Sequence, residues 1–171
     1  MADKANSSIS ASVLKDSLKA SMSGSLIYEP GDASEKWVYV ERKISTASEP
    51  LLTTSDVYID ENTHTGAPAT VASGDVYRWV CIKNTGTTDG STSSNEAIVV
   101  SLAGDAAAVG EVEGIMIGPG EMWVGKFPSA TTQAHIHAIS VDGSASGLGY
   151  ANSTGEGTVH CIIAAVLHDI G

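Results

Sequence analysis

The pair His135 and His137 is the first group in this sequence whose residue types and spacing could do chemistry. Residues two apart on a β-strand point to the same face, and two imidazoles on one face can chelate a divalent metal. A third nitrogen could come from His160 or His64. One hypothesis is therefore a cupin-like, metal-dependent enzyme with His135, His137 and His160 as ligands. We favour the alternative that they are half-exposed or hydrogen-bonded strand residues, because no carboxylate follows the pair until Asp142.

Other catalytic patterns are missing from the sequence. No Gly-x-Ser-x-Gly nucleophile elbow occurs, and His160 points away from its neighbour Cys161 if both lie on one strand. No glycine-rich loop opens a helix in the way that phosphate binding requires. Glu111 and Glu113 share a strand face, but two acids before an apolar run are typical of a solvated strand end. We therefore expect no enzymatic activity, no catalytic residue and no cofactor.

The elements that would position these residues are short strands. Glycine is abundant, with 18 residues, and only 17% of the residues are charged. Gly, Pro, Asn and Asp punctuate a series of short apolar runs, which predicts an all-β chain folded as an antiparallel, jelly-roll-like β-sandwich. The expected strands are Leu26–Glu29, Lys36–Ile44, Val57–Asp60, Val76–Asn84, Ala97–Leu102, Val112–Ile117, Met122–Phe127, Ala134–Val141 and Thr158–Leu167.

The strongest turn signal lies between two of these runs, at Pro119-Gly120. Proline presets φ near −65° and glycine accepts a positive φ, as the two central positions of a type II turn require. We therefore predict a β-hairpin over Val112–Phe127, with Ile117 and Met122 flanking the turn.

Alternation along the strands predicts which side chains are buried. In Lys36–Ile44 we expect the face with Trp37 and Tyr39 to be exposed. Trp37, Tyr39 and Trp123 could form a carbohydrate-binding surface, although core or interface packing is the usual role of such rings. Both cysteines lie in apolar runs and are expected to be buried free thiols. The predicted core is Val80, Ile82, Val99, Ile115, Ile117, Val124, Ile136, Ile163 and Ala165.

Two strands, Val76–Asn84 and Thr158–Leu167, carry apolar residues on both faces. This is more apolar surface than two packed sheets need to cover, which predicts a homo-oligomer, and we expect a trimer. The net charge is −11, with 3 basic and 13 acidic residues in positions 51–171. Such a surface repels phosphate backbones and anionic lipids, so we expect neither nucleic acid nor membrane as a partner. No signal peptide or membrane-spanning run is visible, which predicts synthesis in the cytoplasm.

Residues 1–24 differ from the rest of the chain. Ile9, Val13, Leu14, Leu18 and Met22 recur at spacings of four or five, a weak amphipathic-helix pattern. Chain termini are often poorly ordered unless they pack against the rest of the protein. The sequence therefore leaves two alternatives for this segment, an extended arm and a short helix. We predict residues 1–24 as an N-terminal arm and residues 25–171 as the sandwich domain.

Three segments carry a resemblance to a known family. They are Val76-Tyr-Arg-Trp-Val-Cys-Ile-Lys-Asn-Thr-Gly86, Gly114-Ile-Met-Ile-Gly-Pro-Gly-Glu-Met-Trp123 and Ala134-His-Ile-His-Ala138. Together they resemble the head decoration (cement) proteins of tailed bacteriophages over about residues 76–167, and tail and baseplate proteins share some of these motifs. The resemblance implies a compact β-sandwich without catalytic residues on the outside of the virion capsid, made in the host cytoplasm.

This resemblance also implies a partner, the major capsid protein. We expect the acidic body to face solvent. The nearly neutral N-terminal segment is expected to lie on the capsid, because like-charge repulsion with a partner is lowest there. The residues expected to bind the capsid are Lys4, Ile9, Val13, Lys15, Leu18 and Lys19.

Overall fold

The computed structural model describes residues 4–15, 18–31, 34–59, 69–102, 114–127, 131–141 and 157–170. The chain divides into two compact units, Met1–Ala33 and Ser34–Gly171, which are described separately. Almost all of the regular structure in both units is β-strand, and every strand pairing is antiparallel. The predicted all-β class is confirmed.

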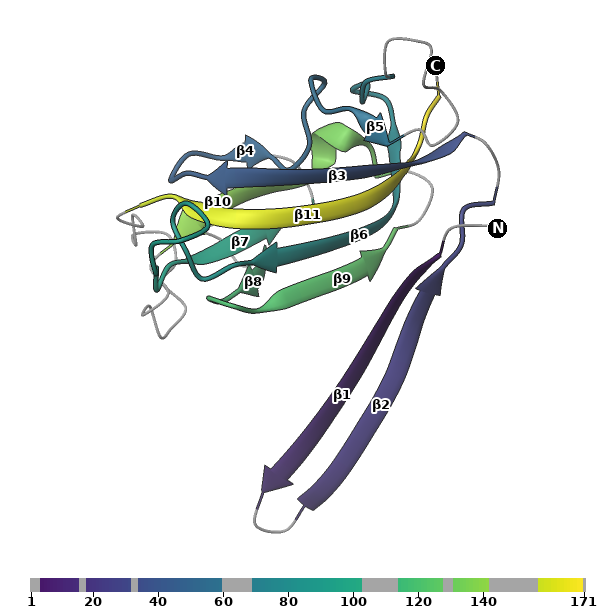
Figure 1. Ribbon diagram of the computed structural model, residues 1–171. Coiled ribbons are helices and arrows are strands. Elements are labelled where there is room, and N and C mark those ends of the chain that lie inside the picture. Colours follow the sequence, from purple (N-terminus) through teal and green to yellow (C-terminus); the bar gives the residue numbers. More distant parts are fainter. Residues whose placement is uncertain are drawn as a thin grey trace. The chain divides into compact units, whose positions relative to one another are not determined.

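The first unit is a two-stranded antiparallel ribbon (Figure 1) made of β1 (Ala5–Lys15) and β2 (Leu18–Tyr28). Its register pairs Ala5 with Tyr28 and Lys15 with Leu18 without interruption. The short amphipathic helix considered within residues 1–24 is therefore wrong, and the alternative of an extended arm is the one that the structure supports. The apolar residues at helical spacing were few, and alternation of apolar residues with serine, as in Ile9-Ser-Ala-Ser-Val13, fits the period of two of a strand. The predicted sandwich strand Leu26–Glu29 instead belongs to this ribbon.

The second unit is a sandwich of two sheets, which Figure 1 shows as two layers. One sheet has the strand order β5-β3-β11-β6-β9 and the other has the order β4-β10-β7-β8. The bounds are β3 Glu35–Ile44, β4 Glu49–Pro50, β5 Tyr58–Ile59, β6 Val76–Asn84, β7 Ala97–Ser101, β8 Gly114–Ile117, β9 Met122–Lys126, β10 His137–Val141 and β11 Val159–His168, with a short 3₁₀ helix η2 at Gln133–His135.

The order of these strands is that of a jelly roll. If the short edge strand β5 is set aside, the two sheets are β3-β11-β6-β9 and β4-β10-β7-β8. The chain passes from one sheet to the other at β3 to β4, β4 to β6, β6 to β7, β8 to β9, β9 to β10 and β10 to β11, and its first and last sandwich strands lie side by side. This is the double-sheet arrangement of eight strands that defines the architecture.

The space between the sheets holds one main apolar core. Of the predicted core residues, Val80, Ile82, Ile117, Ile136, Ile163 and Ala165 are buried in it, and Ile115 packs against it half-buried. The other two lie outside the main core: Val99 is buried, as predicted, and Val124 is a correction. Val99 is buried in a separate cluster with Ala97 and Val141. Val124 pairs with Cys81, one strand position away from the inward-facing pair Ile82 and Trp123, and is therefore only half-buried on the other face of its sheet.

A β-bulge changes the facing of β6. Val166 of β11 pairs with Trp79, whereas the next residue, Leu167, pairs with Tyr77, so that Arg78 is the extra residue. An extra residue shifts the alternation by one position. Tyr77 therefore enters the core with Val80, although strict alternation would place it on the same face as Trp79.

The Pro119-Gly120 turn is present, but the predicted hairpin is wrong. Gly120 has φ of +77°, and the Glu121 amide donates to the Gly118 carbonyl at 3.0 Å. However, β8 pairs with β7 in one sheet and β9 pairs with β6 in the other. The turn therefore carries the chain across the edge of the sandwich, because local turn chemistry reverses a chain without selecting the strands that pair.

Asn84 holds this crossing in place. It is fully buried at the end of β6, and its backbone amide donates to the Glu121 carbonyl at 3.0 Å. Its side-chain amide donates to the carbonyls of Ile117 at 3.2 Å and Glu96 at 3.0 Å, and its side-chain oxygen accepts from the Gly86 amide at 2.8 Å. One side chain thus joins the ends of strands from both sheets to the loop that follows β6.

Candidate functional site

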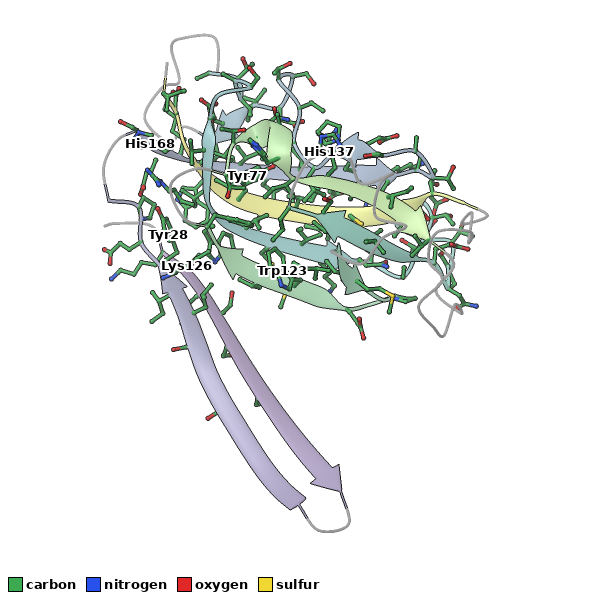
Figure 2. All side chains as sticks on the ribbon, turned by 180° about the vertical axis from the view of Figure 1, so that it is seen from behind. Tyr28, Tyr77, Trp123, Lys126, His137 and His168 are labelled. Carbon is green, nitrogen blue, oxygen red and sulfur yellow. The ribbon has the colours of Figure 1, made fainter. Side chains whose placement is uncertain are left out.

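The three histidines of the metal hypothesis do not come together. His135 ends η2, and His137, labelled in Figure 2, begins β10 in the four-stranded sheet. His160 lies on β11 in the other sheet. The premise that His135 and His137 share a strand face is wrong, because His135 lies in the helix. No group of three or more His, Cys, Asp or Glu residues able to hold a metal occurs among the described residues, which leave out His64.

Each of these histidines has a structural partner. His135 Nδ1 lies 2.5 Å from Thr132 Oγ1, and His137 Nδ1 lies 3.2 Å from Ser48 Oγ. The backbone of His160 donates to the Thr87 carbonyl at 2.8 Å and accepts from the Thr85 amide at 3.0 Å. These two bonds dock the polar loop after β6 against β11, so the main role of this position is to fix the loop.

The aromatic residues considered for carbohydrate binding do not form one platform. Trp123 (Figure 2) pairs with Ile82, packs against the core and meets Phe127 edge-on at a centroid distance of 6.0 Å. Trp37 and Tyr39 lie on the opposite face of the same sheet, where Tyr39 is 49% exposed. The prediction that the Trp37 and Tyr39 face is the exposed one is confirmed, since Val38 on the other face is buried.

The cysteines are free thiols, as predicted, but only one is fully buried. Cys161 lies in the core, and burial raises its pKa to about 12. Cys81 is half-buried on the outer face of β6, and its pKa is also raised by burial, with Lys83 acting in the opposite direction. A neutral thiol is a poor nucleophile, so neither residue has the environment of a reactive cysteine. Glu111 and Glu113 lie outside the described residues.

The outer face of the five-stranded sheet is unusually apolar, and we call it the outer sheet face. Strand pairing arranges its residues in three rows, which are Ile59–Trp37–Val166–Trp79–Lys126, Tyr39–Ala164–Cys81–Val124 and Glu41–Ile162–Lys83–Met122. An antiparallel sheet that faces water on one side normally carries polar residues at these positions. Here ten of the thirteen are apolar or aromatic. Tyr39, Ile59 and Met122 are each about half exposed, at 49%, 52% and 56%, whereas Val166 and Trp79 in the middle of the sheet are buried.

Sequence reasoning found only part of this face. The apolar residues on both faces of Val76–Asn84 and Thr158–Leu167 indicated it, because β6 and β11 lie side by side in the middle of the sheet. The contributions of Ile59 and Met122 were missed. No local pattern in the sequence shows that their short strands flank these two central strands.

Lysines surround the outer sheet face. Residues 34–171 contain 6 basic and 16 acidic side chains. Three of the basic residues pair with acids: Lys36 with Asp169 at 2.5 Å, Arg42 with Asp56 at 2.6 Å and Arg78 with Glu35 at 3.4 Å. Lys43, Lys83 and Lys126 are exposed at outward positions of this face. Among the described residues, the central rows contain one carboxylate, Glu41, which lies 3.4 Å from His160 Nε2.

The two faces of the N-terminal ribbon differ in residue composition, as the register of its strands shows. Its register places Ala5, Ile9, Ala11, Val13, Leu18, Ala20, Met22, Leu26 and Tyr28 at positions of one face, together with Ser7, Lys15 and Gly24. The other face takes Asn6, Ser8, Ser10, Ser12, Leu14, Lys19, Ser21, Ser23, Ser25 and Ile27. One face is therefore mostly apolar and the other mostly serine.

The residues predicted to bind the capsid fall on both faces of this ribbon. Ile9, Val13, Lys15 and Leu18 share the apolar face, and Lys19 is on the serine face, although the side chains of these five lie outside the described part. Lys4 precedes β1, and its Nζ lies 3.0 Å from a carboxylate oxygen of Glu29 with both side chains about half exposed.

Comparison with known proteins gives no relative: no protein family, no curated protein and no solved structure matches the chain. The described residues contain no helix long and apolar enough to span a membrane.

Proposed function

We propose that the protein is a non-enzymatic structural component of a tailed-bacteriophage virion that decorates and stabilises the outer capsid surface. The resemblance of residues 76–167 to head decoration proteins suggests this role. The jelly-roll sandwich is compatible with it, since viral capsid proteins use this architecture, but lectin domains and cupins use it too. A fold does not define a function, so the proposal depends on surfaces suited to attachment.

The observation that carries the proposal is the N-terminal ribbon with its apolar face. A two-stranded hairpin is at best marginally stable alone in water, and three or more strands or a packed apolar face are needed to hold it. The ribbon pairs eleven positions on each strand, yet forms a two-stranded sheet of its own. An ordered ribbon with one apolar face is suited to lying on a larger protein surface.

Charge favours the same segment as the attachment point. The ribbon unit has 3 basic and 4 acidic residues, whereas residues 34–171 have 10 more acidic than basic ones. Repulsion from an acidic capsid lattice is therefore weakest at the ribbon. The partner in this proposal is the major capsid protein, contacted through Lys4, Ile9, Val13, Lys15, Leu18 and Lys19.

A trimer would strengthen this attachment. When one ribbon of an oligomer has bound, the remaining ribbons bind at a high effective concentration, so each needs only modest affinity. Such attachment across neighbouring capsomers would resist their separation under internal DNA pressure. Light scattering of the purified chain should give the mass of three copies, and a monomer both free and on the particle would contradict the trimer.

Capsid shells prepared without this protein test the attachment. A variant lacking residues 1–28, which removes both ribbon strands, should keep the circular dichroism of the sandwich and lose shell binding. A more specific test than the deletion compares two point variants, Leu26→Glu on the apolar face and Ser25→Glu on the serine face. They introduce the same charge at adjacent residues. Leu26→Glu should weaken binding about tenfold or more, because it buries an unpaired charge, and Ser25→Glu should change it little.

The position of the chain in the virion decides the broader assignment. A density map of the particle should place the sandwich on the outside of the head shell. Density on the tail or baseplate, or inside the shell, would overturn the decoration role. Full binding by the variant without residues 1–28 would instead overturn only the ribbon as the attachment point.

A further inference from the structure

We infer that His160 is a proton-operated anchor for the loop that follows β6, residues 85–95, and that the loop is held more firmly when Nε2 of this ring carries a proton. Histidine is the side chain that ordinarily changes charge between pH 5 and 8. All of the residues involved lie within Ser34–Gly171, so this anchor is independent of the ribbon and of the proposed function.

The loop encloses the His160 side chain, and the residue is only 9% exposed. The backbone amide of His160 donates to the Thr87 carbonyl at 2.8 Å, and its carbonyl accepts from the Thr85 amide at 3.0 Å. Gly90 lies against the ring, since a Cβ added there would be 3.8–3.9 Å from Cε1, Nδ1 and Nε2. A change of charge on this ring therefore occurs at the contact between the loop and β11.

The hydrogen bonds around Thr85 determine which nitrogen carries the proton of the neutral His160 ring. The Thr85 hydroxyl has one proton, which it donates to the His160 carbonyl at 2.9 Å. The Thr87 hydroxyl lies 2.6 Å from it and accepts from the Gly90 amide, so its own proton is directed to Thr85 Oγ1. Thr85 Oγ1 can then only accept from Nδ1 of the ring, 3.3 Å away. Neutral His160 therefore carries its proton on Nδ1.

The other ring nitrogen, Nε2, is the atom that takes up a proton, and it faces a carboxylate. It lies 3.4 Å from Oε2 of Glu41 on β3, and this glutamate side chain is 57% exposed. Tyr39 donates to the other carboxylate oxygen, Oε1, at 3.4 Å. In the neutral ring Nε2 and Oε2 are both acceptors and form no hydrogen bond. Protonation turns the same contact into a charge-assisted hydrogen bond, which joins β3 to β11 and, through Nδ1, to the loop.

Charged groups from each neighbouring element act on this ring. On β3, Lys43 is the register partner of His160 and opposes its protonation, as does Lys83 on the same face of β6. In the loop, the Asp89 carboxylate accepts hydrogen bonds from amides of its own turn. Among the described residues, Glu41 is therefore the group whose bond to the ring depends on the uptake of a proton.

The protonation state of the His160 ring is the first test. Long-range nitrogen–proton NMR spectra distinguish the two neutral forms of the ring and follow the uptake of a proton. At pH 8 the proton should be on Nδ1, and Nε2 should gain one as the pH is lowered to 5.5. A proton on Nε2 at pH 8 would overturn the inference, because the neutral ring could then already donate to Glu41.

Amide hydrogen exchange of the loop is the second test. Protection, corrected for the intrinsic exchange rate at each pH, reports local opening of the loop. From pH 8 to pH 5.5 the protection of the Thr85, Gly90 and Ser94 amides should rise about two- to fivefold, as expected for a partly exposed ion pair. The Leu51 amide, which donates to the Ile136 carbonyl outside the loop, should not follow this rise. Equal protection of the loop at both pH values would overturn the anchor.

Two variants and a matched control separate this bond from the general effect of charge. Glu41→Gln should abolish the rise in protection at pH 5.5, because a neutral amide does not form an ion pair with the charged ring. Glu49→Gln removes the same charge from β4 in the other sheet and should keep the rise. His160→Asn cannot take up a proton and should also lose the rise. If His160→Asn fails to fold, the ring spectra and Glu41→Gln still decide, and a rise that persists in Glu41→Gln would overturn the inference.

Discussion

The N-terminal ribbon and the sandwich are both built from antiparallel strands that carry apolar residues, but the two units differ in how these residues are covered. The sandwich packs one sheet on another, and most of its large side chains lie in the shared core. The ribbon is a single layer of two strands with a mostly apolar face and a mostly serine face. In the sandwich each sheet therefore covers the apolar face of the other, whereas the ribbon is a single layer without a second sheet of its own.

Within the five-stranded sheet, a single strand carries both fully buried and partly exposed apolar residues. Along β11, Ile163 points into the core and is fully buried, whereas Ile162 points to the outer sheet face and is only half-buried. The outer sheet face thus has apolar residues, such as Ile162, that are only partly covered, although Val166 and Trp79 on the same face are buried.

The largest expected effect tests this difference along β11. Ile163→Ala should lower the free energy of unfolding of the sandwich by about 2–5 kcal/mol, because it leaves a cavity in the core. Ile162→Ala should cost about 1 kcal/mol or less, since the lost methylenes are partly exposed already. Urea unfolding of both variants gives the two values. Equal losses would show that the outer sheet face is packed as tightly as the core.

A smaller effect compares glycines in the two units. Gly120 has φ of +77° and no atom within 4 Å of an added Cβ, so Gly120→Ala should cost about 1 kcal/mol through backbone strain alone. Gly24 in β2 also has free space around an added Cβ, and its φ is not in the left-handed region. Gly24→Ala should therefore be neutral or slightly stabilising. Thermal unfolding of both variants checks this contrast, and a large loss from Gly24→Ala would mean that the ribbon is packed closely at that position.

The smallest effect concerns pH and the loop after β6. The Thr92 and Ser91 amides donate to Asp89 Oδ1 at 2.7 and 2.9 Å, and these bonds, with the Ser91 hydroxyl, hold the pKa of Asp89 well below its usual range. A lowered pKa stabilises the fold above the unfolded-state pKa of about 4, and this contribution is lost as the pH falls below that value. Asp89→Asn should be less stable than the unaltered chain at pH 7, and the difference should shrink at pH 3. A difference that is the same at both pH values would contradict this origin.

Much of the sandwich could be predicted from the sequence because its strands are strongly patterned. The limits of Val76–Asn84 were predicted as observed, and Lys36–Ile44, Ala97–Leu102 and Thr158–Leu167 differ from the observed strands by one residue at one end or at both. Proline and glycine chemistry also predicted the turn at 118–121, since φ preferences act within a few residues.

The sequence by itself determined where the chain extends, where it turns and which strands have two apolar faces, because these properties depend on neighbouring residues. Tertiary structure alone decided the rest. It assigned β8 and β9 to different sheets, moved Tyr77 inward through a bulge, separated His137 from His160, and gathered Ile59, Met122 and the lysines around the outer sheet face. These outcomes depend on pairings between strands distant in the chain, which are selected by the burial of whole faces.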